Sequence, residues 1–120
     1  MKVAFSTSTG IMIDESFRKA KSFTVWDIAP QESYYVNSIF FNDDAGTEEA
    51  RLTARAEALA HCAILCSPSI NGPAAAKLVA RNIHPMRTVT NTSVEEIIGK
   101  LQQALQENPP PWMRKAQDSI

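Results

Sequence analysis

The sequence predicts an α/β fold in which a five-stranded mixed sheet lies between helices, and two observations support this. Three segments rich in β-branched and aromatic residues precede any helical pattern, which favours an antiparallel meander because antiparallel neighbours need only short connections. After residue 47, helical periodicity alternates with short apolar segments, which is typical of parallel strands joined by right-handed crossovers. The chain has 120 residues, so we expect one domain with a single sheet.

Composition excludes several classes of protein. The hydrophobic fraction is 44% and the charged fraction 21%, which is typical of a globular domain. Twelve Lys and Arg against thirteen Asp and Glu argue against a nucleic-acid binder, which would be strongly basic. No apolar run approaches the roughly 20 residues that a membrane span needs. From the charge balance and the short apolar runs, we expect neither nucleic-acid nor membrane partners. Two cysteines fit a reducing compartment, and no signal-peptide pattern is present, so we expect a cytoplasmic protein.

The first half of the chain predicts three strands. The first, Lys2–Thr7, ends in a polar run that enters a loop. Ser22–Ile28 is rich in β-prone residues and is ended by Pro30, and Tyr34–Phe41 contains aromatic and β-branched residues throughout. If the first strand is central, the second and third lie antiparallel on one side of it.

The second half predicts three helices and two strands. Thr47 can cap a helix that extends to about residue 60, Gly72 and Pro73 open a second that extends to about Asn82, and Ser93 begins a capping box. The third helix continues to Leu105, and the order of elements is βββαβαβα. The two strands between the helices are expected at Cys62–Cys66 and Met86–Val89.

The tail, residues 108–120, is expected to lie outside the single α/β domain of residues 1–107. Three consecutive prolines favour an extended segment, and Trp112 follows them. Trp112 either anchors a partner protein or covers the domain's own apolar surface, and the sequence leaves both alternatives open.

A ligand is expected at the carboxyl ends of the parallel strands, where the chain departs in opposite directions. This crevice lies between the loops 7–17 and 67–72. The second loop ends at a helix start near Gly72, where N–H groups and the helix dipole favour an anion. Arg18, Lys19 and Lys21 flank the first loop. They either attract an anion or form a solvated face.

The two cysteines are poor candidates for a shared metal. On one strand, Cys62 and Cys66 would lie about 13 Å apart, too far for one zinc ion or a disulfide. Cys66 lies near the expected crevice, whereas Cys62 lies at the opposite end with His61 and His84. Buried free cysteines usually act as small hydrophobes, so Cys66 is either a thiolate ligand or a core residue.

Catalysis is the weaker hypothesis. The sequence contains no Walker-type loop, no Gly-x-Gly-x-x-Gly and no Gly-x-Ser-x-Gly motif. Ser69 and His84 are expected at opposite ends of the sheet, so they do not form a nucleophile and base pair. We therefore expect a binding protein and no enzyme.

Five segments together carry a pattern that a known family shares: Val3–Ser8, Glu57–Ile64, Gly72–Val79, Ile83–Pro85 and Asn108–Lys115. Through these segments the chain resembles the nitrogenase accessory proteins of the NifX type, in the dinitrogenase iron–molybdenum cofactor biosynthesis family. This resemblance implies a ribonuclease H-like fold with strand order 3-2-1-4-5 and an antiparallel second strand. It also implies a non-catalytic role, in which iron–sulfur precursors or the finished iron–molybdenum cofactor are bound transiently as cargo and passed to nitrogenase cofactor-assembly proteins or apo-dinitrogenase.

The sequence departs from the family pattern at the expected cargo site. The family commonly has His-Phe-Gly where this chain has Ser16-Phe17-Arg18, and Asn71 stands where a second glycine is usual. Two hypotheses follow. The first is a carrier that holds a cluster loosely, with Cys66 as a possible metal ligand. The second is a regulatory or interaction protein that has lost the cluster site, carries no cargo and acts by binding a nitrogenase-assembly partner. The residues expected to bind cargo are Ser16, Arg18, Lys19, Cys66, Ser69, Asn71 and Gly72.

Overall fold

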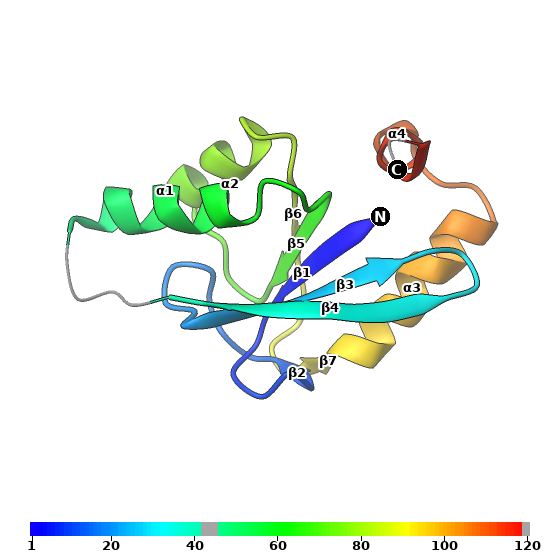
Figure 1. Cartoon of the computed structure of the whole chain (residues 1–120), viewed down its shortest axis with the longest axis horizontal. Coiled ribbons are helices and arrows are strands. Elements are labelled where there is room, and N and C mark those ends of the chain that lie inside the picture. The colour runs from blue at the N-terminus through cyan, green and yellow to red at the C-terminus, as the bar shows by residue number, and fades with distance from the viewer. Residues whose placement is uncertain (42–45, 119–120) are drawn as a thin grey trace.

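The computed structural model describes residues 1–41 and 46–118 of the chain. Its centre is a five-stranded sheet with the order β4-β3-β1-β5-β6, and a separate two-stranded sheet pairs β2 with β7. Helices α1 and α2 cover one face of the large sheet and α3 covers the other (Figure 1). The strands are β1 (Lys2–Ser6), β2 (Met12–Ile13), β3 (Ser22–Ile28), β4 (Ser33–Phe40), β5 (Ile64–Ser67), β6 (His84–Arg87) and β7 (Thr92–Ser93); the helices are α1 (Glu48–Ala58), α2 (Gly72–Val79), α3 (Val94–Gln106) and α4 (Pro111–Asp118).

Strand β1 is the centre of the large sheet. It pairs antiparallel with β3 and parallel with β5, and β5 pairs parallel with β6. The first three long strands therefore form a meander, and the later ones are joined through helices. The prediction of an α/β fold with a mixed five-stranded sheet is confirmed.

Side-chain caps begin the first three helices, and those of α1 and α3 are at the residues that the sequence pattern indicates. Thr47 Oγ1 accepts a hydrogen bond from the Ala50 N–H at 3.1 Å, and Ser93 Oγ accepts one from Glu96 at 3.0 Å. Asn71 caps α2 in the same way. These caps satisfy N–H groups that have no partner within the helix.

The buried side chains form two clusters, one on each face of the sheet. The cluster under α1 and α2 contains Ala4 and Leu65, whereas the cluster under α3 contains Val3 and Cys66. Because successive side chains of a strand point to opposite faces, β1 and β5 contribute to both clusters. Among the described residues, no helix has the length and apolar character needed to cross a membrane.

The two strands of the second half are displaced from their expected positions. Strand β5 begins at Ile64, because the Cys62 N–H donates to the Leu59 carbonyl at 2.8 Å and extends the exit from α1. Cys62 therefore precedes the strand, and the expectation that both cysteines lie on one strand is wrong. Strand β6 begins at His84 and contains Pro85, which is tolerated because β6 is an edge strand of the sheet.

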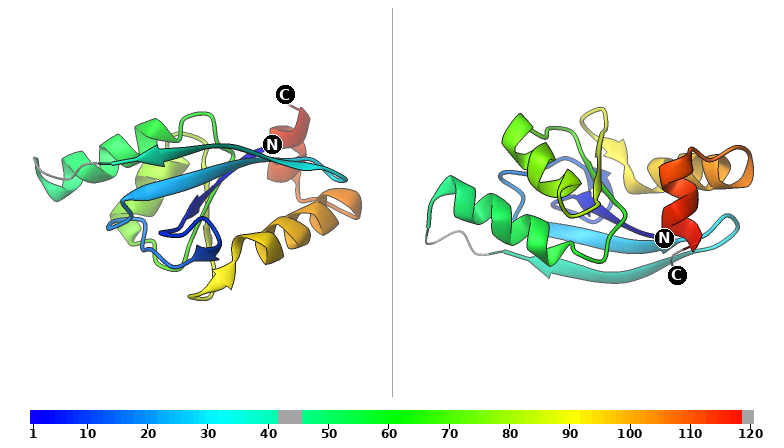
Figure 2. Two further views of the ribbon diagram at one scale, coloured as in Figure 1. Left: turned by 60° about the horizontal axis from the view of Figure 1, so that its bottom comes forward. Right: turned by 90° about the horizontal axis from the view of Figure 1, so that it is seen from above.

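The tail forms a helix, so the expectation of an extended segment is wrong for residues 111–118; residues 119–120 of the tail lie outside the described residues. Pro111 occupies the first helical position, where its missing N–H costs nothing. The Met113 side chain is 3% exposed and joins the cluster under α3. Figure 2 shows α4 beside the N-terminus of the chain.

Strand β4 forms the other edge of the sheet. Its eight residues include no charged side chain, and Tyr34, Tyr35 and Phe40 are exposed. The pairing with β3 shifts register, because Val25 pairs with Asn37 and Trp26 with Tyr35. Val36 lies between the two paired residues of β4, as in a β-bulge.

Candidate functional site

Two loops meet at the carboxyl ends of β1 and β5, where the sequence predicts a crevice. The Phe17 N–H donates to the Ser69 carbonyl at 3.0 Å, and Ser67 Oγ donates to the Glu15 carbonyl at 3.0 Å. Ser67 is fully buried, so this bridge lies inside the fold. The two loops are thus joined by hydrogen bonds that water cannot easily replace.

The first loop ends in a turn over residues 16–20. The Ala20 N–H donates to the Ser16 carbonyl at 2.8 Å, and the Lys19 N–H donates to the same oxygen at 3.2 Å. Phe17 is fully buried and stacks on Phe23, with ring centroids 5.5 Å apart. Burial of Phe17 anchors the turn, while its neighbours Arg18 and Lys19 remain exposed.

A pocket of about 320 Å³ lies between the two loops. Five of the seven residues expected to bind cargo are brought together here, and two are not. The lining residues are Ser16, Arg18, Lys19, Ser69 and Asn71.

The charge at this pocket is basic but partly neutralised. Arg18 Nη1 lies 3.1 Å from Glu48 Oε1, and both side chains are about half exposed. A surface ion pair of this kind is weak, so Arg18 can exchange Glu48 for another anion at little cost. Lys19 lies beside Arg18 on the same rim.

The N-terminus of α2 offers less to an anion than the sequence suggests. Asn71 Oδ1 accepts the Ala74 N–H at 2.8 Å, and the Asn71 carbonyl accepts the Ala75 N–H at 2.9 Å. Pro73 has no N–H. In the first turn of α2, the N–H group that remains for an anion is therefore that of Gly72. Gly72 is not among the residues that line the pocket. A Cβ added at Gly72 would meet nothing within 4 Å, so packing does not require glycine here.

Cys66 is separated from the pocket. Its side chain is fully buried in the cluster under α3, and its Sγ lies 3.9 Å from Met86 Sδ. Burial raises the pKa of the Cys66 thiol, so it is protonated at neutral pH. In this conformation Cys66 cannot reach a ligand held between the loops.

Histidine and cysteine side chains do gather at the opposite end of the sheet. His61, Cys62 and His84, which the sequence analysis places at this end, line one cavity there. Over residues 1–41 and 46–118, however, no group of three or more His, Cys, Asp or Glu side chains has the geometry to hold a metal ion.

Two arginines that position the loops were missed in the sequence analysis. Arg55 is 1% exposed, and its Nη2 donates to the Ala20 carbonyl at 2.6 Å, at the end of the first turn. Arg87 Nη2 donates to the Ile70 carbonyl at 2.6 Å, within the second loop. One feature of the sequence could have indicated the burial of Arg55: it lies on the apolar stripe of α1, between Leu52 and Ala56.

Comparison with known proteins identifies the family. The family model described as "Dinitrogenase iron-molybdenum cofactor" matches residues 1–104, which include every residue that lines the pocket between the loops. The chain belongs to this family. The resemblance found in the sequence is thereby confirmed.

Curated relatives of the family match almost the whole chain. Protein NifX of Herbaspirillum seropedicae is 36% identical over 97% of this chain and 81% of its own length. Protein NifX of Sinorhizobium fredii is 30% identical over 96% of this chain and 76% of its own length. Protein NifY of Azotobacter vinelandii is 35% identical over 97% of this chain, but the chain spans only 48% of that protein.

A solved structure shares the fold. The crystal structure of PH0822 superposes with a TM-score of 0.71 and covers 93% of this chain and 97% of its own. The two sequences are 14% identical, so this likeness concerns the fold alone.

Proposed function

We propose that this protein is a non-catalytic carrier, which binds an iron–sulfur precursor of the nitrogenase cofactor, or the finished iron–molybdenum cofactor, during nitrogenase assembly. The observation that carries the proposal is the family match over residues 1–104, within which the pocket between the loops lies. The protein would act in the cytoplasm and exchange cargo with nitrogenase cofactor-assembly proteins or apo-dinitrogenase.

The pocket would hold such cargo by charge and hydrogen bonding. A cluster with net negative charge is attracted by Arg18 and Lys19 and by the dipole of α2. Ser16, Ser69 and Asn71 add polar atoms around the same space, and the Gly72 amide lies at the start of α2. Because Cys66 is buried, the proposal includes no thiolate bond to iron from this chain. Such a site releases its cargo readily.

The fold is proposed to be of the ribonuclease H-like type. The sheet order β4-β3-β1-β5-β6 and the antiparallel pairing of β3 with β1 support this assignment. The carrier domain of residues 1–107 would then contain the entire large sheet with α1, α2 and α3.

Anaerobic titration with isolated iron–molybdenum cofactor tests the carrier proposal. We expect cofactor to co-elute with the purified protein in gel filtration, with an absorbance band in the protein fraction. The double variant Arg18→Glu and Lys19→Glu should weaken retention by roughly tenfold or more, because both charges face the pocket. Lys21→Glu is the matched control, since Lys21 is exposed but does not line the pocket.

Cys66→Ala distinguishes this proposal from thiolate ligation. We expect the variant to retain cofactor as the wild type does, because its buried sulfur does not reach the pocket. Equal retention by the wild type and the double variant, or loss of retention in Cys66→Ala with its fold intact, would contradict the proposed site.

A second candidate function is a regulatory or interaction protein that carries no cargo. It is favoured by the buried Cys66 and by Ser16, which stands where the family commonly has histidine and is a poor iron ligand. Pull-down from cells grown under nitrogen-fixing conditions separates the two candidates. An assembly partner retained by cofactor-free protein, together with no cofactor retention in the titration, would favour the second function.

A further inference from the structure

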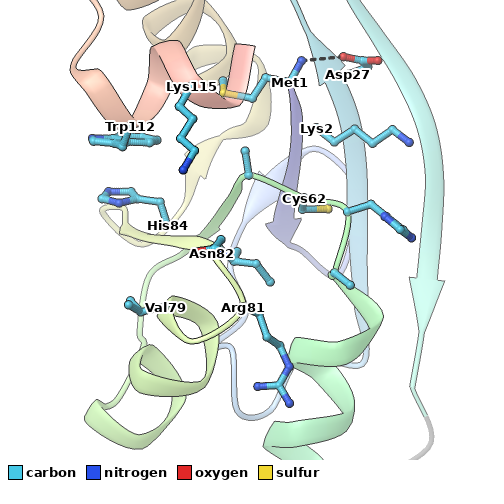
Figure 3. Close-up of a pocket in the computed structure, with 14 residues that line it drawn as sticks. Met1, Lys2, Asp27, Cys62, Val79, Arg81, Asn82, His84, Trp112 and Lys115 are labelled. Carbon is cyan, nitrogen blue, oxygen red and sulfur yellow. Dashed lines mark hydrogen bonds and ion pairs between the residues drawn. The ribbon is translucent and has the colours of Figure 1, made fainter. Parts of the chain in front are cut away.

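A second cavity lies at the opposite end of the sheet from the pocket between the loops. Its volume is about 800 Å³, and it opens where β1, β5 and β6 begin (Figure 3). Lys2 and His84 are the first residues of β1 and β6, and Cys62 precedes β5. Trp112 and Lys115 come from α4. The cavity therefore depends on the tail helix, which lies beyond the residues 1–104 matched by the family model.

A pair of stacked aromatic rings lines one side of this cavity. The rings of His84 and Trp112 stack with centroids 4.0 Å apart and an interplanar angle of 13°. Burial of Met113, next to Trp112, fixes α4 against the body of the protein. Val79 and Ile83 add apolar surface on the side of α2. This side of the cavity is thus aromatic and apolar, and Met113 attaches it to the core.

The polar groups at the cavity are mainly cationic. Lys2, Arg81 and Lys115 line it, although the whole chain has a formal net charge of -1. The Asp27 carboxylate, which also lines it, lies 3.1 Å from the amino group of Met1. Figure 3 shows Lys115 extending from α4 toward the space beside His84 and Asn82, whereas Arg81 extends away toward α1. Arg81 lies 3.6 Å from Glu57 on that helix.

The Cys62 thiol, which lines the cavity, does not repel an anion. Burial raises the pKa of Cys62 to about 11, so its thiol is neutral at physiological pH. The Cys62 thiol therefore adds no negative charge to the cavity. Asn82 adds an amide to the same space, and its backbone is left-handed with φ of 60°, a conformation that asparagine tolerates well.

We infer that this cavity binds a small organic anion with an aromatic body, its charged group beside Lys115 and its body against the partly buried rings of Trp112 and His84. The volume lies within the roughly 300–1,000 Å³ typical of small-molecule sites, which are mostly apolar with a few placed polar groups. This second site is independent of the proposed cargo pocket, because the two have no lining residue in common.

A matched pair of aromatic probes tests the inference. 2-Naphthoate carries a carboxylate on a flat body, and 2-naphthamide has the same shape without the charge. In calorimetric titration of the full chain, we expect naphthoate to bind at least about tenfold more tightly than the amide, a difference of about 1.4 kcal/mol. In a ¹⁵N-labelled sample, naphthoate should shift the amide signals of Cys62, Ala63 and His84 and leave those of Ser16 and Lys19 in place.

Charge variants on α4 complete the test. Lys115→Gln should weaken naphthoate binding about fivefold or more, because it removes a cation at the cavity. Arg114→Gln is the matched control: Arg114 is on the same helix and bonds to Asn108 Oδ1 but does not line the cavity. The inference is overturned if naphthoate does not bind at millimolar concentration, if the amide binds equally well, or if the two variants weaken binding to the same extent.

Discussion

At the scale of single residues, Arg55 links the core to the candidate cargo site. Its guanidinium lies 5.0 Å from the centre of the Phe41 ring and donates to the Ala20 carbonyl. That carbonyl belongs to the last residue of the turn that presents Arg18 and Lys19 to the pocket. One buried side chain of α1 therefore positions the basic rim of the pocket, although it does not line the pocket itself.

Replacing Arg55 should destabilise the protein strongly. Arg55→Ala removes a charged hydrogen bond, leaves the Ala20 carbonyl without this donor and opens a cavity, so we expect a loss of about 2–4 kcal/mol in the free energy of unfolding. Urea denaturation measures this loss. Lys100→Ala is the comparison, because Lys100 forms an exposed pair with Glu96 at 3.9 Å and should cost at most about 0.5 kcal/mol. Equal losses in the two variants would contradict the role of Arg55.

Sequence reasoning succeeded for residues whose role follows from chain position. Thr47 and Ser93 cap α1 and α3, and Arg18 and Lys19 line the pocket that follows the end of a central strand. It did not place Cys66, because β5 is buried on both faces. A continuously apolar strand has no alternating pattern, so nothing in the sequence indicated which face the sulfur joins.

At the scale of elements, α4 is the largest departure from the expected structure. Three prolines in a row favour an extended chain, but only the last of them belongs to the helix. Trp112 and Met113 then pack on the protein's own surface, which supports the covering role among the two alternatives for Trp112. Such docking depends on the tertiary surface that receives the helix, which local sequence does not display.

Met113 should control the docking of α4. Met113→Ala removes a side chain that is 3% exposed, and a buried methionine replaced by alanine typically costs about 2–5 kcal/mol. Because α4 can detach while the sheet stays folded, we expect faster hydrogen exchange in α4 with near wild-type protection in β1 and β5. Arg114→Ala should leave exchange in α4 nearly unchanged. Uniformly faster exchange across the whole chain would contradict local detachment.

At the scale of the whole molecule, the sheet places the two pockets at opposite ends. Both the mixed sheet and the loop pocket were predictable, since strand-rich and helix-alternating halves of the chain determine the connections. The cavity at the other end was not, because it is completed by α4 and by residues that precede β5 and β6. The residues that line this cavity come from distant parts of the sequence and become neighbours only in the folded protein.

The stability of the whole fold should depend on pH through His84. Burial lowers the His84 pKa below its usual 6.5, so the unfolded chain binds a proton more readily than the folded protein does. The unfolding free energy should therefore fall as the pH drops from about 7 to about 5, and should not change through this group at higher pH. Urea denaturation at both pH values measures the fall.

His84→Phe is the variant that isolates this contribution. It preserves an aromatic ring for Trp112 but cannot be protonated, so the difference in unfolding free energy between the two pH values should shrink. An unchanged or larger difference in His84→Phe would contradict the assignment to His84.

The bulge at Val36 has a consequence for the behaviour of the protein in a crowded solution. An uncharged eight-residue edge with exposed aromatic side chains would otherwise be a template on which further chains could add as strands. The register shift divides β4 into two short regular stretches and increases the local twist. Neither stretch offers a long straight row of hydrogen-bonding groups, so the bulge protects the protein from aggregation without the help of a single charge on the strand.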